Sequence, residues 1–466
     1  MQNEFIVAKF GGTSVANLKA INQCARIIKA SPEVKIVVVS AAANITNLLT
    51  RLGKNTTLKT ERKIAIDHIR AIVHPMLNAL KDDELTQRIE ALLKDLQLCS
   101  QLVERINNTQ ITDEILSFGE RASALIVSSA FNKAGISSYH VDARTLIETD
   151  SRFSQAKPKV SSIPQKIKSV LNRIADDTII ITEGFIGIDS AGNTTTLGRG
   201  GSDYSAALLA AACSAKSLKI WTDVKGIYQV DPRIVPDAKL IDNLSFNEAA
   251  ELATFGAKVL HPSTLWPAIR QNIRVFVGST FEPETGGTWI SGDNTLASMP
   301  IVRALARRQH QTLITIKNLN MFQTPGFLAR LFTLIAQHHI SIDLITTSEV
   351  SVALTIDHIA DSPSHTMPIS LELIEDIKAL GDVELSIENE LCLIAIIGNG
   401  LHQHSGIASR LFGCIGDINI RLINHGASGH NLCLLVRESD ADVILTRIYD
   451  LYFADSAQHQ DLRIEA

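Results

Sequence analysis

The stretch that decides the fold is Phe5-Ile-Val-Ala-Lys-Phe-Gly-Gly-Thr-Ser14, near the start of the chain. Its first residues form an apolar run, which is typical of a buried strand, and this run ends at Lys9. Gly11 and Gly12 follow directly and let the backbone approach a bound group closely. The stretch therefore predicts a strand whose end presents a cation and open backbone N–H groups.

A helix is expected to follow this strand, over residues 15–30. Thr13 or Ser14 is placed to serve as its N-cap, which brings the positive end of a helix next to Lys9. A cation, free N–H groups and a helix N-terminus together suit a phosphate. On its own, the pattern fits an ordinary strand-to-helix turn equally well.

Composition indicates a globular protein of more than one domain. The chain has 466 residues, of which 45% are hydrophobic and 20% charged, and this length predicts two or three domains. A net charge of −5 without a basic run argues against nucleic acid or an anionic membrane as partner. The six cysteines are scattered, and the sequence shows neither a signal peptide nor an apolar run of about 20 residues. We therefore expect a cytoplasmic protein without disulfides or a metal held by the chain itself.

Strands and helices alternate up to about residue 290, where the character of the sequence changes. Four further strands are short, β-branched and continuously apolar: Lys35-Ile-Val-Val-Val-Ser40, Thr178-Ile-Ile-Ile-Thr182, Ser217-Leu-Lys-Ile-Trp221 and Ile273-Arg-Val-Phe-Val277. Such strands are covered on both faces, so the pattern predicts an α/β domain with a mostly parallel sheet between helices. Residues 60–107 read as a charged helical hairpin or cap outside this sheet.

The C-terminal part contains an internal repeat with a period of about 80 residues. Gly326-Phe-Leu-Ala-Arg-Leu-Phe332 matches Gly406-Ile-Ala-Ser-Arg-Leu-Phe412, and Ile340-Ser-Ile-Asp-Leu-Ile345 matches Ile418-Asn-Ile-Arg-Leu-Ile423. Each copy is predicted to run strand, helix, strand, strand, helix, strand, as a small α+β sandwich. The duplication alone could be purely structural, although a ligand site between copies would also fit.

A second glycine-rich loop is Thr194-Thr-Thr-Leu-Gly-Arg-Gly-Gly-Ser-Asp-Tyr204. Arg199 projects from this loop, and its planar fork suits a carboxylate. Ser202 or Asp203 is placed to cap the Ala/Leu-rich helix expected over residues 204–215. The loop predicts a site for an anionic substrate, and the alternative is a solvated turn with a structural arginine.

Two later segments, Trp221-Thr-Asp-Val-Lys-Gly-Ile-Tyr228 and Phe255-Gly-Ala-Lys-Val-Leu-His-Pro262, contribute polar residues near strand ends. In open α/β sheets, ligands bind at the carboxyl ends of strands. The candidates for holding a ligand here are Thr222, Asp223, Tyr228, Arg233 and Lys258. Each segment taken alone fits a structural role as well.

Glu120 lies in an apolar helical stretch, where an unpaired carboxylate would be costly to bury. Either Arg121 pairs with it or it meets the amine of a substrate. Thr46 ends a turn of small residues and could donate a hydrogen bond to a carboxylate. For both Glu120 and Thr46, a capping or packing role remains open.

Several enzyme classes are excluded by missing motifs. The sequence has no Gly-x-x-x-x-Gly-Lys-Ser/Thr loop, no His-Arg-Asp or Asp-Phe-Gly motif, and no Gly-x-Gly-x-x-Gly after a strand. It is therefore not a P-loop enzyme, a protein kinase or a typical dinucleotide-binding dehydrogenase.

Taken together, the motifs make the whole chain resemble aspartate kinase, a member of the amino acid kinase fold. The segments that carry the resemblance are Lys9-Phe-Gly-Gly-Thr-Ser14, the turn at residues 40–47, Phe118-Gly-Glu120, Thr195-Thr-Leu-Gly-Arg-Gly-Gly-Ser-Asp203, Trp221-Thr-Asp-Val-Lys-Gly-Ile-Tyr228 and Phe255-Gly-Ala-Lys-Val-Leu-His-Pro262. The most similar form is the single-function, lysine-inhibited bacterial type. The resemblance implies an amino acid kinase domain over residues 1–295, followed by two ferredoxin-like ACT domains over residues 310–390 and 391–466.

The resemblance also implies a reaction, namely transfer of the γ-phosphoryl group of ATP to the β-carboxylate of L-aspartate. The product, 4-phospho-L-aspartate, opens lysine, threonine and methionine biosynthesis, and Mg²⁺ would arrive with the nucleotide. Lys9 and Asp203 would be catalytic, and Thr46, Glu120, Arg199 and Ser202 would bind aspartate. The nucleotide would be bound by Lys9, Gly11, Gly12, Thr222, Asp223, Tyr228, Arg233 and Lys258.

Feedback inhibition by L-lysine is a further implication of the resemblance. The positions that match the family's lysine site are Met321, Thr324, Phe327, Leu328, Ser341, Ile342, Asp343, Thr347, Ser348 and Glu349. ACT domains of this family pair between subunits, so a homodimer or a dimer of dimers is expected. Two alternatives stay open: a related amino acid kinase with another acceptor, and a non-catalytic amino-acid sensor.

Overall fold

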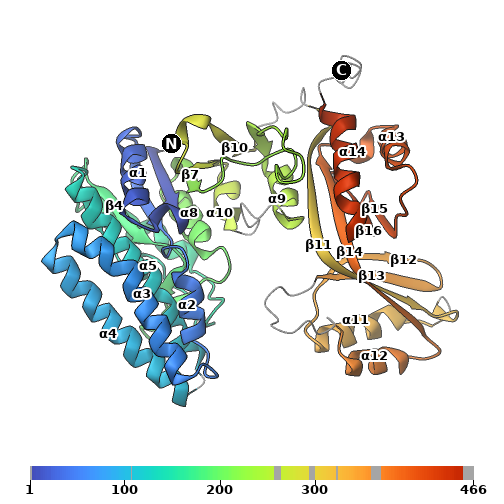
Figure 1. Cartoon of the computed structure of the whole chain (residues 1–466), viewed down its shortest axis with the longest axis horizontal. Helices are drawn as coiled ribbons and strands as arrows, with labels where there is room; N and C mark the ends of the chain where they lie inside the picture. Colours follow the sequence, from blue (N-terminus) through green and yellow to red (C-terminus); the bar gives the residue numbers. More distant parts are fainter. Residues whose placement is uncertain are drawn as a thin grey trace. The chain divides into compact units, whose positions relative to one another are not determined.

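The computed structural model describes residues 3–106, 108–256, 264–292, 300–321, 324–357 and 369–454. The chain forms two compact units, drawn in Figure 1. The first unit comprises Met1–Ile227, Leu240–Ala249 and Lys258–Asn294, and the second comprises Tyr228–Lys239, Ala250–Ala257 and Thr295–Ala466. Among the helices in the described ranges, none has the length and apolar character needed to span a membrane.

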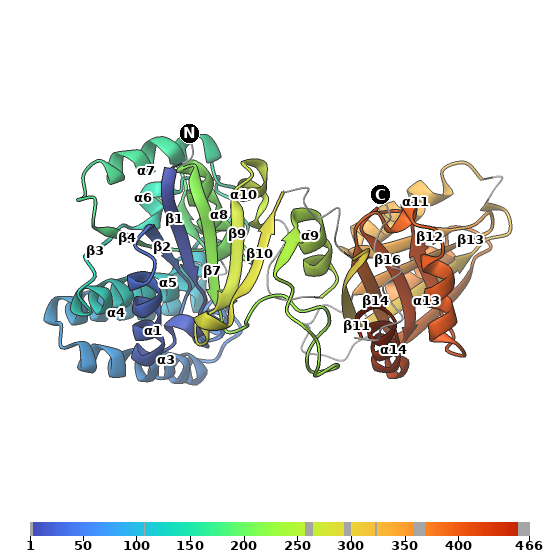
Figure 2. The same cartoon turned by 90° about the horizontal axis from the view of Figure 1, so that it is seen from above.

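The first unit is built on an eight-stranded sheet in the order β3-β4-β2-β1-β7-β9-β10-β8, which Figure 2 shows from above. All neighbouring pairs from β3 to β9 are parallel, whereas β10 runs antiparallel to β9. The predicted α/β class with a mostly parallel sheet is therefore confirmed. The strands are β1 (Asn3–Phe10), β2 (Val34–Val39), β3 (Ser138–His140), β4 (Ile179–Glu183), β7 (Ala215–Thr222), β8 (Asn243–Ser245), β9 (Arg274–Ser279) and β10 (Gly287–Ser291).

Helices cover this sheet, and a two-stranded ribbon of β5 (Ile186–Ile188) and β6 (Thr194–Thr196) lies beside it. The predicted helical hairpin is present as α3 and α4, which pack with α5 (Figure 1). The helices of this unit are α1 (Leu18–Lys29), α2 (Ile45–Leu52), α3 (Lys59–Leu80), α4 (Asp83–Arg105), α5 (Thr109–Lys133), α6 (Ala143–Leu146), α7 (Ile163–Leu171), α8 (Gly201–Ala212) and α10 (Trp266–Arg270). A further helix, α9 (Phe246–Thr254), has residues in both units.

Strand β1 has a different environment on each of its faces, because successive side chains of a strand point to opposite sides. Ile6, Ala8 and Phe10 join the apolar cluster formed with α1 and α5. Lys9 points to the other side, where its ammonium meets Asp203 of α8. The alternation within β1 thus places one charged group at the end of an otherwise apolar strand.

The predicted helix caps are wrong in both glycine-rich loops. Helix α1 begins at Leu18, and its N-cap is Asn17, whose side chain accepts a hydrogen bond from the Ala20 N–H at 3.0 Å. Ser14 instead lies in a short 3-10 turn and shares a 2.7 Å hydrogen bond with Thr280. Helix α8 begins at Gly201, and its N-cap is Gly200. Gly200 has a φ of 72°, in the left-handed region, which favours glycine.

The second unit contains a six-stranded antiparallel sheet in the order β12-β13-β11-β14-β16-β15. Two long strands, β11 (Val302–Lys317) and β14 (Glu384–Gly398), run through both halves of it. The other elements are β12 (Ile342–Thr347), β13 (Ser351–Asp357), β15 (Leu422–His425), β16 (Asn431–Arg437), α11 (Phe327–Gln337), α12 (Leu371–Lys378), α13 (Ile407–Ile415) and α14 (Ala441–Phe453). Helices α11 and α12 share an apolar cluster with one half, and α13 and α14 with the other (Figure 1).

The second repeat follows the predicted order of elements from β14 to α14, and its predicted last strand lies outside the described residues. Its first strand, the part of β14 from Leu391 to Gly398, pairs on one side with β16. On its other side it pairs with residues 302–308 of β11, which precede the first repeat in the sequence. In the first repeat, the corresponding neighbour of the first strand is residues 384–388, which form the last strand of the same repeat. The two repeats are therefore interleaved through β11 and β14 rather than arranged one after the other.

Candidate functional site

The ends of β1 and β7 bring Lys9, Gly11 and Thr222 together. These strands are parallel neighbours, and the N–H of Gly11 donates to the carbonyl of Trp221 at 2.9 Å. A Cβ added at Gly11 would lie 3.9 Å from the Lys9 Nζ and 3.8 Å from the Thr222 Oγ1. The backbone between the two strand ends is thus open beside an ammonium and a hydroxyl group.

Lys9 forms an ion pair with Asp203, in the first turn of α8, and the Nζ–Oδ1 distance is 2.7 Å. Only 10% of the Lys9 side chain and 15% of the Asp203 side chain is exposed. Shielding from water strengthens the interaction of both charges with any group that enters the site. The ammonium has three donors, so it can hold a further anionic oxygen while it contacts Asp203.

Two glycines allow the neighbouring turns to close around this pair. A Cβ on Gly12 would lie 2.7 Å from the carbonyl oxygen of Ala41, in the turn after β2. A Cβ on Gly184, directly after β4, would lie 2.5 Å from the Cβ of Ser202. Real side chains do not reach such distances, so the ends of β1, β2 and β4 and the start of α8 depend on glycine for their spacing.

Glu120 lies in the middle of α5 rather than at a helix start, and it is 5% exposed. The sequence left two partners open for it, and the structure excludes the first, because Arg121 pairs with Glu114 at 2.8 Å. Burial raises the pKa of Glu120 to about 8, and the charge of Glu183 acts in the same direction. The hydrogen bond from the backbone of Ala41 and the charge of Lys9 lower this pKa and only partly offset the effect of burial.

Glu183 is a residue of this site that the sequence analysis missed. It ends β4, is 1% exposed, and accepts hydrogen bonds from the Ala143 N–H at 2.8 Å and from His140 at 2.6 Å. The sequence signal was a Glu-Gly pair directly after the apolar strand predicted at residues 178–182. The charge of Glu183 acts on Glu120 and helps to raise the pKa of that carboxyl group.

The other three residues predicted to bind aspartate lie in the first turns of two helices and in one loop. Thr46 is exposed in the first turn of α2, and Ser202 is half-buried in the first turn of α8. Arg199 is exposed in the loop before α8, and its guanidinium makes no ion pair within the described ranges. These three side chains are available to a ligand.

The predicted nucleotide-binding residues are divided between different parts of the chain. Thr222 donates to Asp223 at 3.0 Å just after β7. Tyr228 and Arg233 belong to the second unit, where Tyr228 packs against the apolar cluster of α13 and α14. Arg233 forms a two-pronged contact with Asp231. Lys258 lies outside the described residues.

The residues predicted to bind lysine lie in the first half of the second unit, between the end of β11 and the turn after β12. Met321, Phe327 and Ile342 contribute to one apolar cluster there. Four exposed members lie before β12, within it or in the turn after it: Ser341, Thr347, Ser348 and Glu349. Thr324 lies before α11, and Leu328, which is also exposed, lies in the first turn of this helix.

Asp343 has a specific electrostatic environment within this group. Its Oδ1 lies 2.7 Å from Arg308, which also contacts Asp357 at 3.3 Å and the carbonyl of Thr254. The Oδ2 of Asp343 is buried and has no hydrogen-bond partner among the described residues. Asp343 therefore retains one acceptor for a cationic group.

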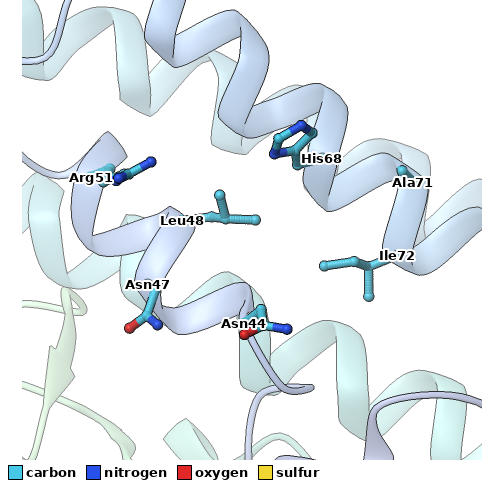
Figure 3. Close-up of a pocket in the computed structure, with 7 residues that line it drawn as sticks. All are labelled: Asn44, Asn47, Leu48, Arg51, His68, Ala71 and Ile72. Atoms are coloured by element: carbon cyan, nitrogen blue, oxygen red, sulfur yellow. The ribbon is translucent and has the colours of Figure 1, made fainter.

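A separate hollow of about 380 Å³ lies between α2 and α3, and Figure 3 shows the side chains that line it. It includes Asn47, Leu48 and Arg51 of α2 and His68 of α3. None of the predicted site residues lines it, so we assign it no role in the site around Lys9.

Glu120 should make the stability of the protein depend on pH. Between its ordinary pKa of 4.5 and about 8, the folded protein holds a proton that the unfolded chain has released. The free energy of unfolding should therefore fall as the pH rises through this range, by on the order of 5 kcal/mol in total. Denaturant unfolding at pH 5 and pH 9 should show a smaller pH dependence for Glu120→Gln. The same dependence in both proteins would contradict the raised pKa.

Comparisons with known proteins agree with this arrangement. The sequence profile of the Amino acid kinase family matches residues 4–279, and that of the ACT domain matches residues 314–359 and 394–451. The chain is 43% identical to lysine-sensitive aspartokinase 3 of Escherichia coli, over 97% of this chain and 100% of that protein. It also matches, with a TM-score of 0.84 and 42% identity over 97% of this chain and 100% of the other, the crystal structure of E. coli aspartokinase III in complex with aspartate and ADP in the R-state. The structure of that enzyme in complex with lysine and aspartate in the T-state matches equally well, with a TM-score of 0.84. The chain belongs to the aspartokinases, with an amino acid kinase domain and ACT domains.

Proposed function

We propose that this protein is an aspartate kinase, which transfers the γ-phosphoryl group of ATP to the β-carboxylate of L-aspartate. The observation that carries the proposal is the shielded ion pair of Lys9 and Asp203, 2.7 Å long, at the ends of the central strands. Gly11 and Gly12 leave the backbone beside it open to a phosphate. The product, 4-phospho-L-aspartate, is an acyl phosphate and opens the synthesis of lysine, threonine and methionine.

The reaction needs charge stabilisation more than proton transfer. The β-carboxylate of aspartate is ionised at neutral pH, so it can attack phosphorus without a general base. Lys9 stabilises the negative charge on the transferring phosphoryl group, and Asp203 holds the ammonium in place. Catalysis then depends mainly on how precisely the two substrates are positioned.

Aspartate is held through its two other charged groups. Arg199 binds the α-carboxylate with its planar guanidinium group, and Glu120 receives the α-ammonium group, whose positive charge opposes the effect of burial and favours the ionised form of Glu120. Glu120 is suited to this because Arg121 is engaged with Glu114, so the buried carboxylate has no basic side chain next to it in sequence to pair with. Thr46 and Ser202 supply hydroxyl groups from the first turns of α2 and α8.

The nucleotide binds next to the ends of β1 and β7. This part of the site is formed by Lys9, Gly11, Gly12, Thr222 and Asp223. The remaining candidates for nucleotide binding are Tyr228, Arg233 and Lys258. Mg²⁺ arrives bound to the ATP phosphates, where it neutralises part of their charge. Among the described residues, no three His, Cys, Asp or Glu side chains are grouped to hold a metal.

The acceptor test decides between this proposal and the two alternatives. The protein is incubated with ATP-Mg and L-aspartate, L-glutamate or carbamate, and any acyl phosphate is trapped with hydroxylamine. Hydroxamate should form with aspartate alone. No hydroxamate with any acceptor would favour a sensor, and hydroxamate with another acceptor would favour a different amino acid kinase.

Replacing Arg199 by alanine should weaken aspartate binding selectively. The loss of a charged hydrogen bond of about 1.5–3 kcal/mol predicts a 10- to 100-fold higher KM for aspartate, with the KM for ATP unchanged within about twofold. Arg173→Ala is the matched control, because Arg173 is also an exposed arginine of the first unit. Equal loss of affinity for both substrates would contradict the role of Arg199.

L-Lysine is the proposed inhibitor, bound in the first repeat. Helix α11 begins at Phe327 after Gly326, which has a φ of 81°, and its first turn offers backbone N–H groups to a carboxylate. The free buried oxygen of Asp343 suits an ammonium group. Binding there would compete with Arg308 and would favour a state of the enzyme with low substrate affinity.

The second repeat differs at the position that corresponds to Asp343. That position is Arg421, whose guanidinium pairs with Glu388 at 2.8 and 3.0 Å. An arginine there repels an ammonium group rather than binding it. We therefore place the lysine site in the first repeat.

Asp343→Asn should reduce lysine inhibition and leave catalysis intact. We expect the half-inhibitory lysine concentration to rise at least tenfold, because a charged hydrogen bond is lost, with kcat unchanged in the absence of lysine. Glu349→Gln is the companion variant, because this exposed residue is the other candidate for the ammonium. Full inhibition of both variants at the wild-type lysine concentration would place the lysine site elsewhere.

The proposed domain boundaries follow from the resemblance: a kinase domain over residues 1–295 and ACT domains over residues 310–390 and 391–466, with the strand exchange through β11 described above.

We propose a homodimer, or a dimer of dimers, that assembles through the ACT domains. We also propose a cytoplasmic location, where the six cysteines would stay reduced.

A further inference from the structure

Asp113 is a carboxylate of α5 that the proposed reaction does not use. The residue is fully buried, with 0% of its surface exposed. A buried carboxylate is costly unless other groups satisfy its oxygens. Burial raises the pKa of Asp113, and four hydrogen-bonding groups in its surroundings partly offset this rise.

Within the part of the chain that the structure describes, the donors to Asp113 come from two residues, Ser154 and Thr196. The Oδ2 accepts the N–H of Ser154 at 2.9 Å and the N–H of Thr196 at 2.8 Å. The Oδ1 accepts the hydroxyl groups of Thr196 at 3.0 Å and Ser154 at 3.3 Å, and the N–H of Ser154 at 3.1 Å. One side chain thus fixes two separate backbone segments to α5.

The first of these segments, at Thr196, leads into the loop that carries Arg199, and the second, at Ser154, contacts that loop. Thr196 is the last residue of β6 and lies three positions before Arg199. The carbonyl oxygen of Ser154 lies 3.3 Å from the position of a Cβ on Gly198, so the two loops touch. Ser154 has a φ of 70°, an uncommon value for a residue other than glycine, which the contacts with Asp113 stabilise. The position of the Arg199 loop therefore depends on Asp113.

The same helix also carries Glu120. Asp113 and Glu120 are seven residues apart, which is close to two turns, so both lie on one face of α5. Between them in the sequence, Gly119 packs closely against the turn after β2 and against α2, because a Cβ there would lie 2.6 Å from the Cβ of Ala41 and 3.2 Å from side-chain carbons of Ile45 and Leu49. Helix α5 thus connects Glu120, the start of α2 with Thr46, and the Arg199 loop.

We propose that Asp113 is a positioning residue for the substrate amino acid, because it fixes the spacing between Arg199 and Glu120. This inference rests on the proposed function, in which Arg199 binds the α-carboxylate and Glu120 the α-ammonium. An error of about 1 Å in such a site lowers the rate by about 100-fold. Lys9 and Thr222 lie on β1 and β7 and do not depend on Asp113, so nucleotide binding is unaffected.

The test compares Asp113→Ala with Asp113→Asn in the full-length protein. Asparagine keeps one oxygen for the two backbone N–H groups, and its amide can donate to the hydroxyl groups of Ser154 and Thr196, which can rotate to accept. Asp113→Asn should change the KM for aspartate by less than about threefold. Asp113→Ala should raise it at least tenfold and leave the KM for ATP within about twofold.

Asp189 supplies a matched structural control. It is a buried carboxylate at the far end of the β5–β6 ribbon and accepts hydrogen bonds from Ser151, Ala191 and Asn193. Asp189→Ala should lower the melting temperature without changing the ratio of the two KM values. An equal change in that ratio for Asp189→Ala and Asp113→Ala would overturn the proposal.

A double-mutant cycle tests whether Asp113 acts through Arg199. In the Arg199→Ala background, Asp113→Ala should cause no further rise in the KM for aspartate, and independent, multiplying effects would overturn the proposal. If Asp113→Ala does not fold, Asp113→Asn combined with Thr196→Val replaces it. That pair removes an acceptor for the amide and should raise the KM for aspartate at least tenfold; a wild-type KM would overturn the proposal. A wild-type protein that forms no hydroxamate from aspartate would instead contradict the proposed function.

Discussion

The ion pair between Lys9 and Asp203 is the interaction on which the rest of the site depends. It joins the end of β1 to the first turn of α8, in surroundings that leave little of either side chain exposed. Removing one partner of a shielded pair leaves the other charge uncompensated, which is strongly unfavourable. The close approach at Gly12 and Gly184 arranges the neighbouring strand ends around this pair. Such an arrangement holds a positive charge in a fixed position, which phosphoryl transfer needs.

Helix α5 is the second organising element. It packs against α2 through Gly119, carries the buried Glu120 and fixes the end of β6 through Asp113. Groups that are proposed to hold aspartate lie far apart in the sequence, at positions 46, 120 and 199, and this helix relates them in space. The second unit repeats the principle with β11 and β14, because each long strand belongs to both halves of one sheet.

Much of the fold was predictable from the sequence, because short apolar strands and glycine pairs are local signals. The parallel sheet, the α3–α4 hairpin and the duplicated C-terminal half were predicted from such patterns. The N-cap of α1 was missed, because Ser14 is engaged by Thr280, 266 residues away in the sequence. The strand exchange of residues 302–308 was missed for the same reason, since pairing with β14 leaves no local mark. Asp113 and Glu183 went unnoticed because a single carboxylate shows its importance only through partners that the fold supplies.

The most direct test of the account measures kcat for Lys9→Met, Asp203→Asn and the double variant, at saturating ATP-Mg and aspartate with hydroxylamine present. If the pair acts as one unit on the transferring phosphoryl group, each single variant should lose at least about 100-fold in kcat, and the double variant should be little worse than the poorer single one. A Lys9→Met enzyme that retained kcat within about threefold of wild type would contradict the account.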